Sequence, residues 1–121
     1  MHGREKAAEK RHEVSEEELS AVLGEIKTRI SALLGTRLER MLLYGSRARG
    51  DYGPESDIDI AIIVKEFDRK LKDKILETIA EVELAYLTPV SALVLSQQTF
   101  TSLLRRERRI ALDIEREGIP I

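Results

Sequence analysis

The sequence contains no cysteine and no asparagine, and it has only two histidines among its 121 residues. The absence of cysteine excludes disulfide bonds, thiolate chemistry and zinc sites with sulfur ligands. The two histidines, His2 and His12, lie in a charged N-terminal stretch, which argues against a histidine metal site. Glutamine is limited to Gln97 and Gln98, whereas Glu, Lys and Arg are abundant, a composition associated with heat-loving organisms.

Long apolar runs are also absent. No apolar run approaches the roughly 18 residues that a membrane-spanning helix needs. The N-terminal stretch is charged and lacks the apolar segment of a signal peptide, so we expect a cytoplasmic protein. Aromatic residues make up 4% of the chain, and the three tyrosines are scattered, so no aromatic platform for stacking nucleic acid bases is evident.

The charges nearly balance, with 20 basic and 22 acidic side chains and a net charge of −2. This balance gives no overall argument for binding nucleic acid or an anionic membrane. Charged residues make up 35% of the chain and apolar residues 42%, which is typical of a single folded domain. We expect residues 15–121 to form that domain and residues 1–14 to form a flexible or helical arm.

Apolar residues recur at helical spacing in three stretches. The first begins at Ser15, which forms a capping box with Glu18, and ends at Gly35. The second covers residues 68–86, and the third begins after the capping residue Ser96 and ends near Gly118. Residues 41–44, 58–64 and 90–95 have the composition of buried strands. The order α-β-β-α-β-α predicts an α+β fold, with a small mixed sheet and helices packed on one side.

The segment between the first two strands has the pattern G-S-x10-D-x-D. Gly45 follows a strand, so backbone amides beyond it can approach an anion without a side chain in the way. The hydroxyl of Ser46 and a following helical turn would supply further donors to phosphate oxygens. Arg47 and Arg49 add planar, permanently charged donors that suit phosphate. These four residues, with Ser56, are our candidate phosphate-binding residues.

Asp57 and Asp59 lie two positions apart on the second predicted strand, so their side chains point to the same face. Two carboxylates held close together are unfavourable unless a cation neutralises them. Mg²⁺ prefers carboxylates, water and substrate phosphates as ligands. The pattern therefore predicts a magnesium–triphosphate site with Asp57 and Asp59 as metal ligands and catalytic residues.

This pattern, read as Gly-Ser-Arg-Ala-Arg-Gly followed by Ser-Asp-Ile-Asp, resembles the signature of the DNA polymerase β-like nucleotidyltransferase superfamily. It is most similar to the minimal nucleotidyltransferases of bacteria and archaea, and the order of elements agrees over nearly the whole chain. The resemblance implies transfer of a nucleoside monophosphate, AMP above all, from ATP or another triphosphate to a hydroxyl group, with Mg²⁺ or Mn²⁺. Gly45 and Ser46 would hold the triphosphate, and Asp57 and Asp59 the metal.

Many minimal members are similar to antitoxins that are paired with a helical HEPN-domain toxin, so the resemblance implies a partner protein as the acceptor. The superfamily usually has a third carboxylate on the strand after the second helix. Ser91 stands at that position here, while Glu81 and Glu83 fall on the preceding helix. The alternative is therefore a catalytically silent module that binds a nucleotide or a partner. Homo-oligomerisation is left open.

Residues 105–109 contain the only basic cluster, Arg-Arg-Glu-Arg-Arg. A solvated helix face is the favoured interpretation, because Arg109 and Asp113 have the spacing of a helical ion pair. Contact with nucleic acid is the less favoured interpretation of this cluster.

Overall fold

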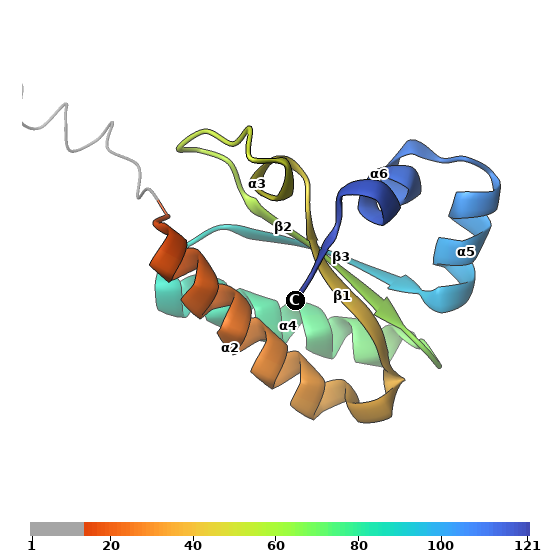
Figure 1. Ribbon diagram of the computed structural model, residues 1–121. Coiled ribbons are helices and arrows are strands. Elements are labelled where there is room, and N and C mark those ends of the chain that lie inside the picture. Colours follow the sequence, from red (N-terminus) through yellow and green to blue (C-terminus); the bar gives the residue numbers. More distant parts are fainter. Residues whose placement is uncertain (1–13) are drawn as a thin grey trace, which may run out of the picture.

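The computed structural model describes residues 14–121 (Figure 1). The arm expected over residues 1–14 therefore lies outside the described residues, except for Val14. The helices are α2 (Glu16–Leu34), α3 (Ser46–Arg49), α4 (Arg69–Tyr86), α5 (Gln97–Arg105) and α6 (Arg109–Glu117), with a 3-10 turn, η1 (Gly35–Arg37). The strands are β1 (Leu38–Tyr44), β2 (Ile58–Val64), β3 (Val90–Ser96) and β4 (Ile119–Pro120).

The four strands form one mixed sheet in the order β3-β2-β1-β4. Strand β1 is antiparallel to both β2 and β4, while β2 and β3 are parallel and are joined through α4. The predicted α+β class and mixed sheet are confirmed. Strand β4 was not predicted, since it is only two residues long and contains a proline, and it forms by pairing with Leu42 and Leu43.

The main core lies between the sheet and the two long helices, α2 and α4, which run side by side beneath it (Figure 1). Strand β2 contributes Ile58, Ile60 and Ile62, each fully buried on this face. The helices contribute residues at the spacing of one helical stripe: Val22, Ile26, Ile30 and Leu34 from α2, and Leu71, Ile75, Ile79 and Val82 from α4.

The predicted helix caps are confirmed. The side-chain oxygens of Ser15 and Ser96 accept hydrogen bonds from the backbone N–H groups of Glu18 and Thr99, each at 3.0 Å. Asp68, which was not predicted as a cap, also caps α4, with its side chain accepting from the N–H of Leu71 at 2.8 Å. Each cap satisfies a backbone donor that the first helical turn leaves unpaired, and so the three caps define where these helices begin.

The expectation of helices on one side holds for α2 and α4 but not for the end of the chain. Helices α5 and α6 pack against the opposite face, where Phe100, Ala111 and Ile114 form a second core with Leu42 and Ile63. The one long helix predicted after Ser96 is also wrong, because the chain turns over residues 106–108. A straight helix would carry its far end away from the sheet, whereas the turn lets both short helices bury apolar residues against it.

None of the helices over residues 14–121 is long and apolar enough to cross a membrane.

Candidate functional site

The turn after β1 is built around Gly45, whose backbone has φ 77° and ψ −157°, a region that only glycine populates readily. A Cβ added at this position would lie 2.5 Å from the carboxylate oxygen Oδ2 of Asp59. The backbone conformation therefore favours glycine, and any side chain here would displace the carboxylate of Asp59. The structure thus brings the Gly-Ser turn against the acidic pair, as the sequence pattern predicted.

The short helix α3 begins directly after this turn. The N–H groups of Ala48 and Arg49 donate to the carbonyl of Gly45, each at 3.1 Å, and the N–H of Gly50 donates to Ser46 at 2.9 Å. The N–H groups of Ser46 and Arg47, in the first turn, have no acceptor within the helix. Such amides at the start of a helical turn are suited to binding phosphate oxygens.

Asp59 lies in β2 on the face opposite the main core, and Asp57 directly precedes the strand. Ile58, between them in sequence, is fully buried on the other face, while Asp57 is exposed and Asp59 is half-buried. In the sheet register, Asp59 is aligned with Tyr44 of β1 and with Ser91 of β3. These three side chains therefore lie on one face, across three adjacent strands.

Asp59 is a half-buried carboxylate close to a second carboxylate. Burial raises the pKa of Asp59, the charge of Asp57 raises it further, and Arg49 opposes this with a smaller effect in the other direction. Burial and the charge of Asp59 also raise the pKa of Tyr44. A divalent cation between the two carboxylates would remove this penalty, so the residues present fit a hard, oxygen-binding metal ion.

The position expected for a third carboxylate holds a hydroxyl instead. Ser91 is aligned with Asp59 in the parallel β2–β3 register. The neighbouring acids of α4 are engaged elsewhere, because Glu81 pairs with Arg29 and Glu83 accepts a hydrogen bond from the N–H of Val90 at 3.0 Å. Within residues 14–121, no three acidic or histidine side chains group closely enough to hold a metal ion.

Arg47 is directed into the loop that joins α3 to β2. It is only 6% exposed, and its Nε and Nη2 donate to the carbonyl of Ser56 at 3.3 and 3.1 Å. Its guanidinium also lies 4.6 Å from the ring centre of Tyr52. The hydroxyl of Ser56 accepts a hydrogen bond from the N–H of Gly53 at 3.0 Å. Both residues thus shape the loop that leads into Asp57, and their predicted contact with phosphate stays a prediction.

Arg49 lies near enough to Asp59 to lower its pKa, and it is held by two other carboxylates. Its Nε donates to Asp51 at 3.1 Å and its Nη1 to Glu117 of α6 at 3.2 Å, and these bonds raise its pKa. The sequence predicted Arg49 but neither Glu117 nor Tyr44. Glu117 is 68 positions away in sequence, and no local pattern connects the two residues.

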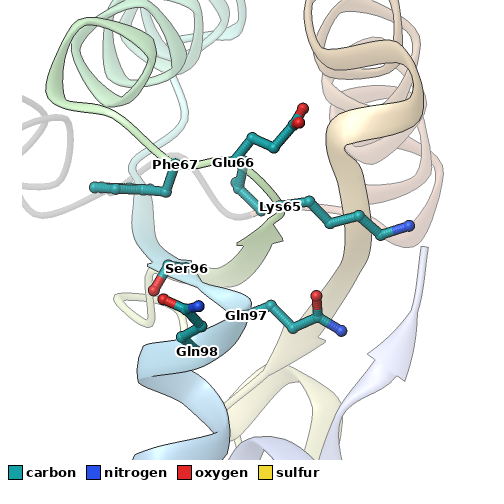
Figure 2. Close-up of a pocket in the computed structure, with 7 residues that line it drawn as sticks. Lys65, Glu66, Phe67, Ser96, Gln97 and Gln98 are labelled. Carbon is teal, nitrogen blue, oxygen red and sulfur yellow. The ribbon is translucent and has the colours of Figure 1, made fainter.

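A cavity of about 560 Å³ lies at the other end of β2, between residues 64–67 and residues 96–98. Figure 2 shows its lining side chains, with Lys65, Glu66 and Phe67 on one side and Ser96, Gln97 and Gln98 on the other. The lining contains one carboxylate and neither aspartate of the pair. This cavity is therefore separate from the acidic site.

Three comparisons place the chain among known proteins. The model of the nucleotidyltransferase domain matches residues 23–116. "Putative protein adenylyltransferase MJ0141" of Methanocaldococcus jannaschii is 34% identical over 98 residues, which are 80% of this chain and 99% of the relative. "Putative protein adenylyltransferase MJ0604" of the same organism is 39% identical over 64 residues, 53% of this chain and 60% of that one.

A crystal structure of a putative nucleotidyltransferase from Sulfolobus solfataricus has the same fold. It superposes with a TM-score of 0.53 at 22% identity, over 83% of this chain and 76% of that chain. The residues that the family model matches include the turn at Gly45, Asp57, Asp59 and the strand that carries Ser91. By the family model and by the relative that it matches over almost its full length, this chain belongs to the nucleotidyltransferase domain family.

Proposed function

We propose that this protein transfers a nucleoside monophosphate, AMP from ATP, to a hydroxyl group on a partner protein, with Mg²⁺ or Mn²⁺ held by Asp57 and Asp59. The observation that carries this proposal is the contact between the glycine turn and the acidic pair. A Cβ at Gly45 would lie 2.5 Å from Asp59 Oδ2, so the amides proposed to bind phosphate lie next to a carboxylate proposed to bind metal.

In this reaction the acceptor oxygen forms a bond to the α-phosphorus, the bond from that phosphorus to the β-phosphate bridge breaks, and pyrophosphate leaves. Bound metal would neutralise charge on the phosphate oxygens. The chain's own contribution is to hold and orient: the turn at Gly45 and Ser46 would bind the triphosphate, and Arg49, whose charge acts on Asp59, would contact it. The hydroxyl of Ser91 is a poor base, so the acceptor's proton leaves to a group that the partner or the acceptor supplies.

The proposed acceptor rests on two supports. The relative that this chain matches over 99% of its length carries the words "protein adenylyltransferase" in its name. The Gly-Ser and Asp-x-Asp pattern resembles that of minimal nucleotidyltransferases paired with helical HEPN-type proteins. A small helical protein of that type is therefore the partner that we would try first.

A silent binding module is the second candidate, and the position of Ser91 favours it. Without a third carboxylate, the site retains two metal ligands and the phosphate-binding turn. Such a protein would bind the metal–nucleotide complex, or the partner, without transferring AMP.

The first experiment measures thermal unfolding with each of the four nucleoside triphosphates, with and without Mg²⁺, in the wild type and in Asp59→Asn. A ligand at 100 times its dissociation constant should stabilise the wild type by about 2.7 kcal/mol, a shift of several degrees. The shift should require Mg²⁺ and should disappear in the variant. No shift with any nucleotide would contradict the proposed site.

The second experiment measures transfer of label from α-labelled ATP to a co-purified helical partner. Asp57→Asn and Asp59→Asn should each abolish transfer while the circular dichroism spectrum stays unchanged. Full transfer by either variant would contradict the assigned site. Nucleotide binding without any transfer by the wild type would favour the silent module.

A further inference from the structure

The corner between α5 and α6 carries four arginines in five positions: Arg105, Arg106, Arg108 and Arg109. All four side chains are exposed. The chain reverses here, with Glu107 in a left-handed conformation at φ 53°, so the charges gather on one corner of the molecule. We propose that this corner, together with the outer face of α5, binds the phosphate backbone of a nucleic acid.

The arginines of this corner lack the carboxylate partners that three of the described arginines have. Arg29, Arg40 and Arg49 each pair with a carboxylate, whereas none of the four corner arginines forms an ion pair with a residue in 14–121. The helical pair expected between Arg109 and Asp113 is not formed. Four neighbouring cations that form no ion pair within residues 14–121, with only Glu107 between them in sequence, repel one another, and a polyanion would relieve that repulsion.

The surface next to the corner carries neutral hydrogen-bonding groups. A groove of about 320 Å³ on the outer face of α5 is lined by Gln97, Gln98, Thr101, Ser102 and Arg105. No acidic residue occurs between Glu83 and Glu107 in a chain with 22 of them. Amide, hydroxyl and guanidinium groups are the ones that contact phosphates and sugars in nucleic acid complexes, and no carboxylate on α5 opposes that approach.

The composition of this surface distinguishes a nucleic acid from an acidic protein as its ligand. Protein interfaces have an apolar centre, whereas nucleic acid interfaces are polar and positively charged. The large exposed apolar residues of the chain lie on other elements, apart from Ile110 at 38% exposure beside the corner, and α5 carries none of them. The net charge of −2 for the whole chain does not reflect this local concentration of positive charge.

The scaffold under the corner is well packed. Phe100 of α5 is 4% exposed, and Ala111 and Ile114 of α6 are fully buried against the sheet. The arginines therefore project from a fixed platform on the side of the sheet that also carries Asp57 and Asp59. The proposed binding does not depend on the transferase reaction, and its failure would leave the nucleotide site unaffected.

The test measures the fluorescence anisotropy of three labelled probes. They are a duplex DNA of about 20 base pairs, a single-stranded RNA of about 20 nucleotides and a poly-glutamate peptide. With about three phosphates contacted, the affinity for duplex DNA should fall about 40-fold between 50 and 200 mM salt, and that for single-stranded RNA about 20-fold. The triple variant Arg105→Gln, Arg106→Gln, Arg109→Gln should lose at least about 10-fold in affinity and most of the salt dependence.

The matched control is the triple variant Lys70→Gln, Lys72→Gln, Lys74→Gln, which removes the same charge from the exposed side of α4. It should change the affinity by less than about twofold. Absence of nucleic acid binding by the wild type at low salt would overturn the proposal. Equal losses in the two variants, or binding of the poly-glutamate peptide alone, would also overturn it. Melting curves of both triple variants check that they fold. Arg106→Gln alone repeats the binding test, with a smaller expected loss of affinity.

Discussion

At the scale of single residues, Gly45 and Asp59 constrain each other. Replacing Gly45 by alanine would put a methyl group against the carboxylate of Asp59 and force alanine into a region open only to glycine. We expect Gly45→Ala to lower the free energy of unfolding by about 1–3 kcal/mol and to abolish nucleotide binding. Urea unfolding and the nucleotide-dependent thermal shift measure the two effects.

The control for this variant is Gly24→Ala. Gly24 lies in α2 with no atom within 4 Å of an added Cβ, and so alanine fits there. The substitution should raise the free energy of unfolding by about 0.5–1 kcal/mol, since alanine loses less backbone freedom in a helix, and should leave nucleotide binding unchanged. A Gly45→Ala protein as stable as the wild type would show that the turn tolerates a side chain.

The raised pKa of Asp59 predicts a pH dependence of stability. The folded state holds the proton of Asp59 more tightly than the unfolded state does. Protonated Asp59 therefore makes its whole contribution to the free energy of unfolding below the ordinary pKa of 3.8. It is lost as the pH rises through the higher folded pKa. Without metal, the free energy of unfolding of the wild type should therefore fall relative to that of Asp59→Asn over this range.

Urea unfolding in EDTA, at a series of pH values from about 3.5 to 7, measures this difference. Mg²⁺ with nucleotide should reverse the trend, because it stabilises the ionised pair. If the wild type instead gains stability relative to Asp59→Asn as the pH rises in EDTA, Asp59 is stabilised as an anion without metal.

At the scale of elements, the end of α4 contains a residue in an unfavourable conformation. Leu87 caps the helix with φ 52° and ψ 40°, a left-handed conformation that favours glycine, and its side chain is 73% exposed. Leu87→Gly should raise the free energy of unfolding by up to about 1 kcal/mol, because the steric cost disappears and little apolar contact is lost.

Leu84 provides the control, since it is the same residue type, is 75% exposed and lies within the helix. Leu84→Gly should lower the free energy of unfolding by about 1 kcal/mol. Chemical unfolding of both variants checks the opposite signs. If both variants lose stability equally, the side chain of Leu87 makes contacts that outweigh its backbone conformation.

At the scale of the whole molecule, one sheet supports two cores. Phe100 is the only buried residue of α5 and packs against the face opposite α2 and α4. Phe100→Ala should cost about 3–5 kcal/mol, because it leaves a cavity in the smaller core. The unfolding should remain a single transition, since both cores share the strands of the sheet.

The other phenylalanine, Phe67, is 37% exposed and serves as the control, with an expected loss of about 1 kcal/mol or less. Circular dichroism and tyrosine fluorescence should give coincident transitions for both variants. Two separate transitions in Phe100→Ala would show that α5 and α6 unfold independently of the rest.

Much of this protein follows from local sequence. The caps at Ser15, Asp68 and Ser96 and the three main strands depend on short-range spacing and local hydrogen bonds. The shared face of Asp57 and Asp59 follows from the two-residue period of a strand. The pairing of a Gly-Ser turn with these aspartates also indicated the family, because a ligand with phosphates and a metal needs both kinds of group.

Tertiary structure decided the rest. The turn over residues 106–108 forms because two short helices bury more apolar surface on the sheet than one straight helix would. The ion pair between Arg49 and Glu117, and the alignment of Ser91 with Asp59, depend on contacts between residues far apart in sequence. Arg47, a predicted phosphate ligand, is buried and donates to a carbonyl in its own loop, a contact that no local pattern predicts. Local patterns determine the conformation of segments, whereas the packing of segments determines which side chains meet.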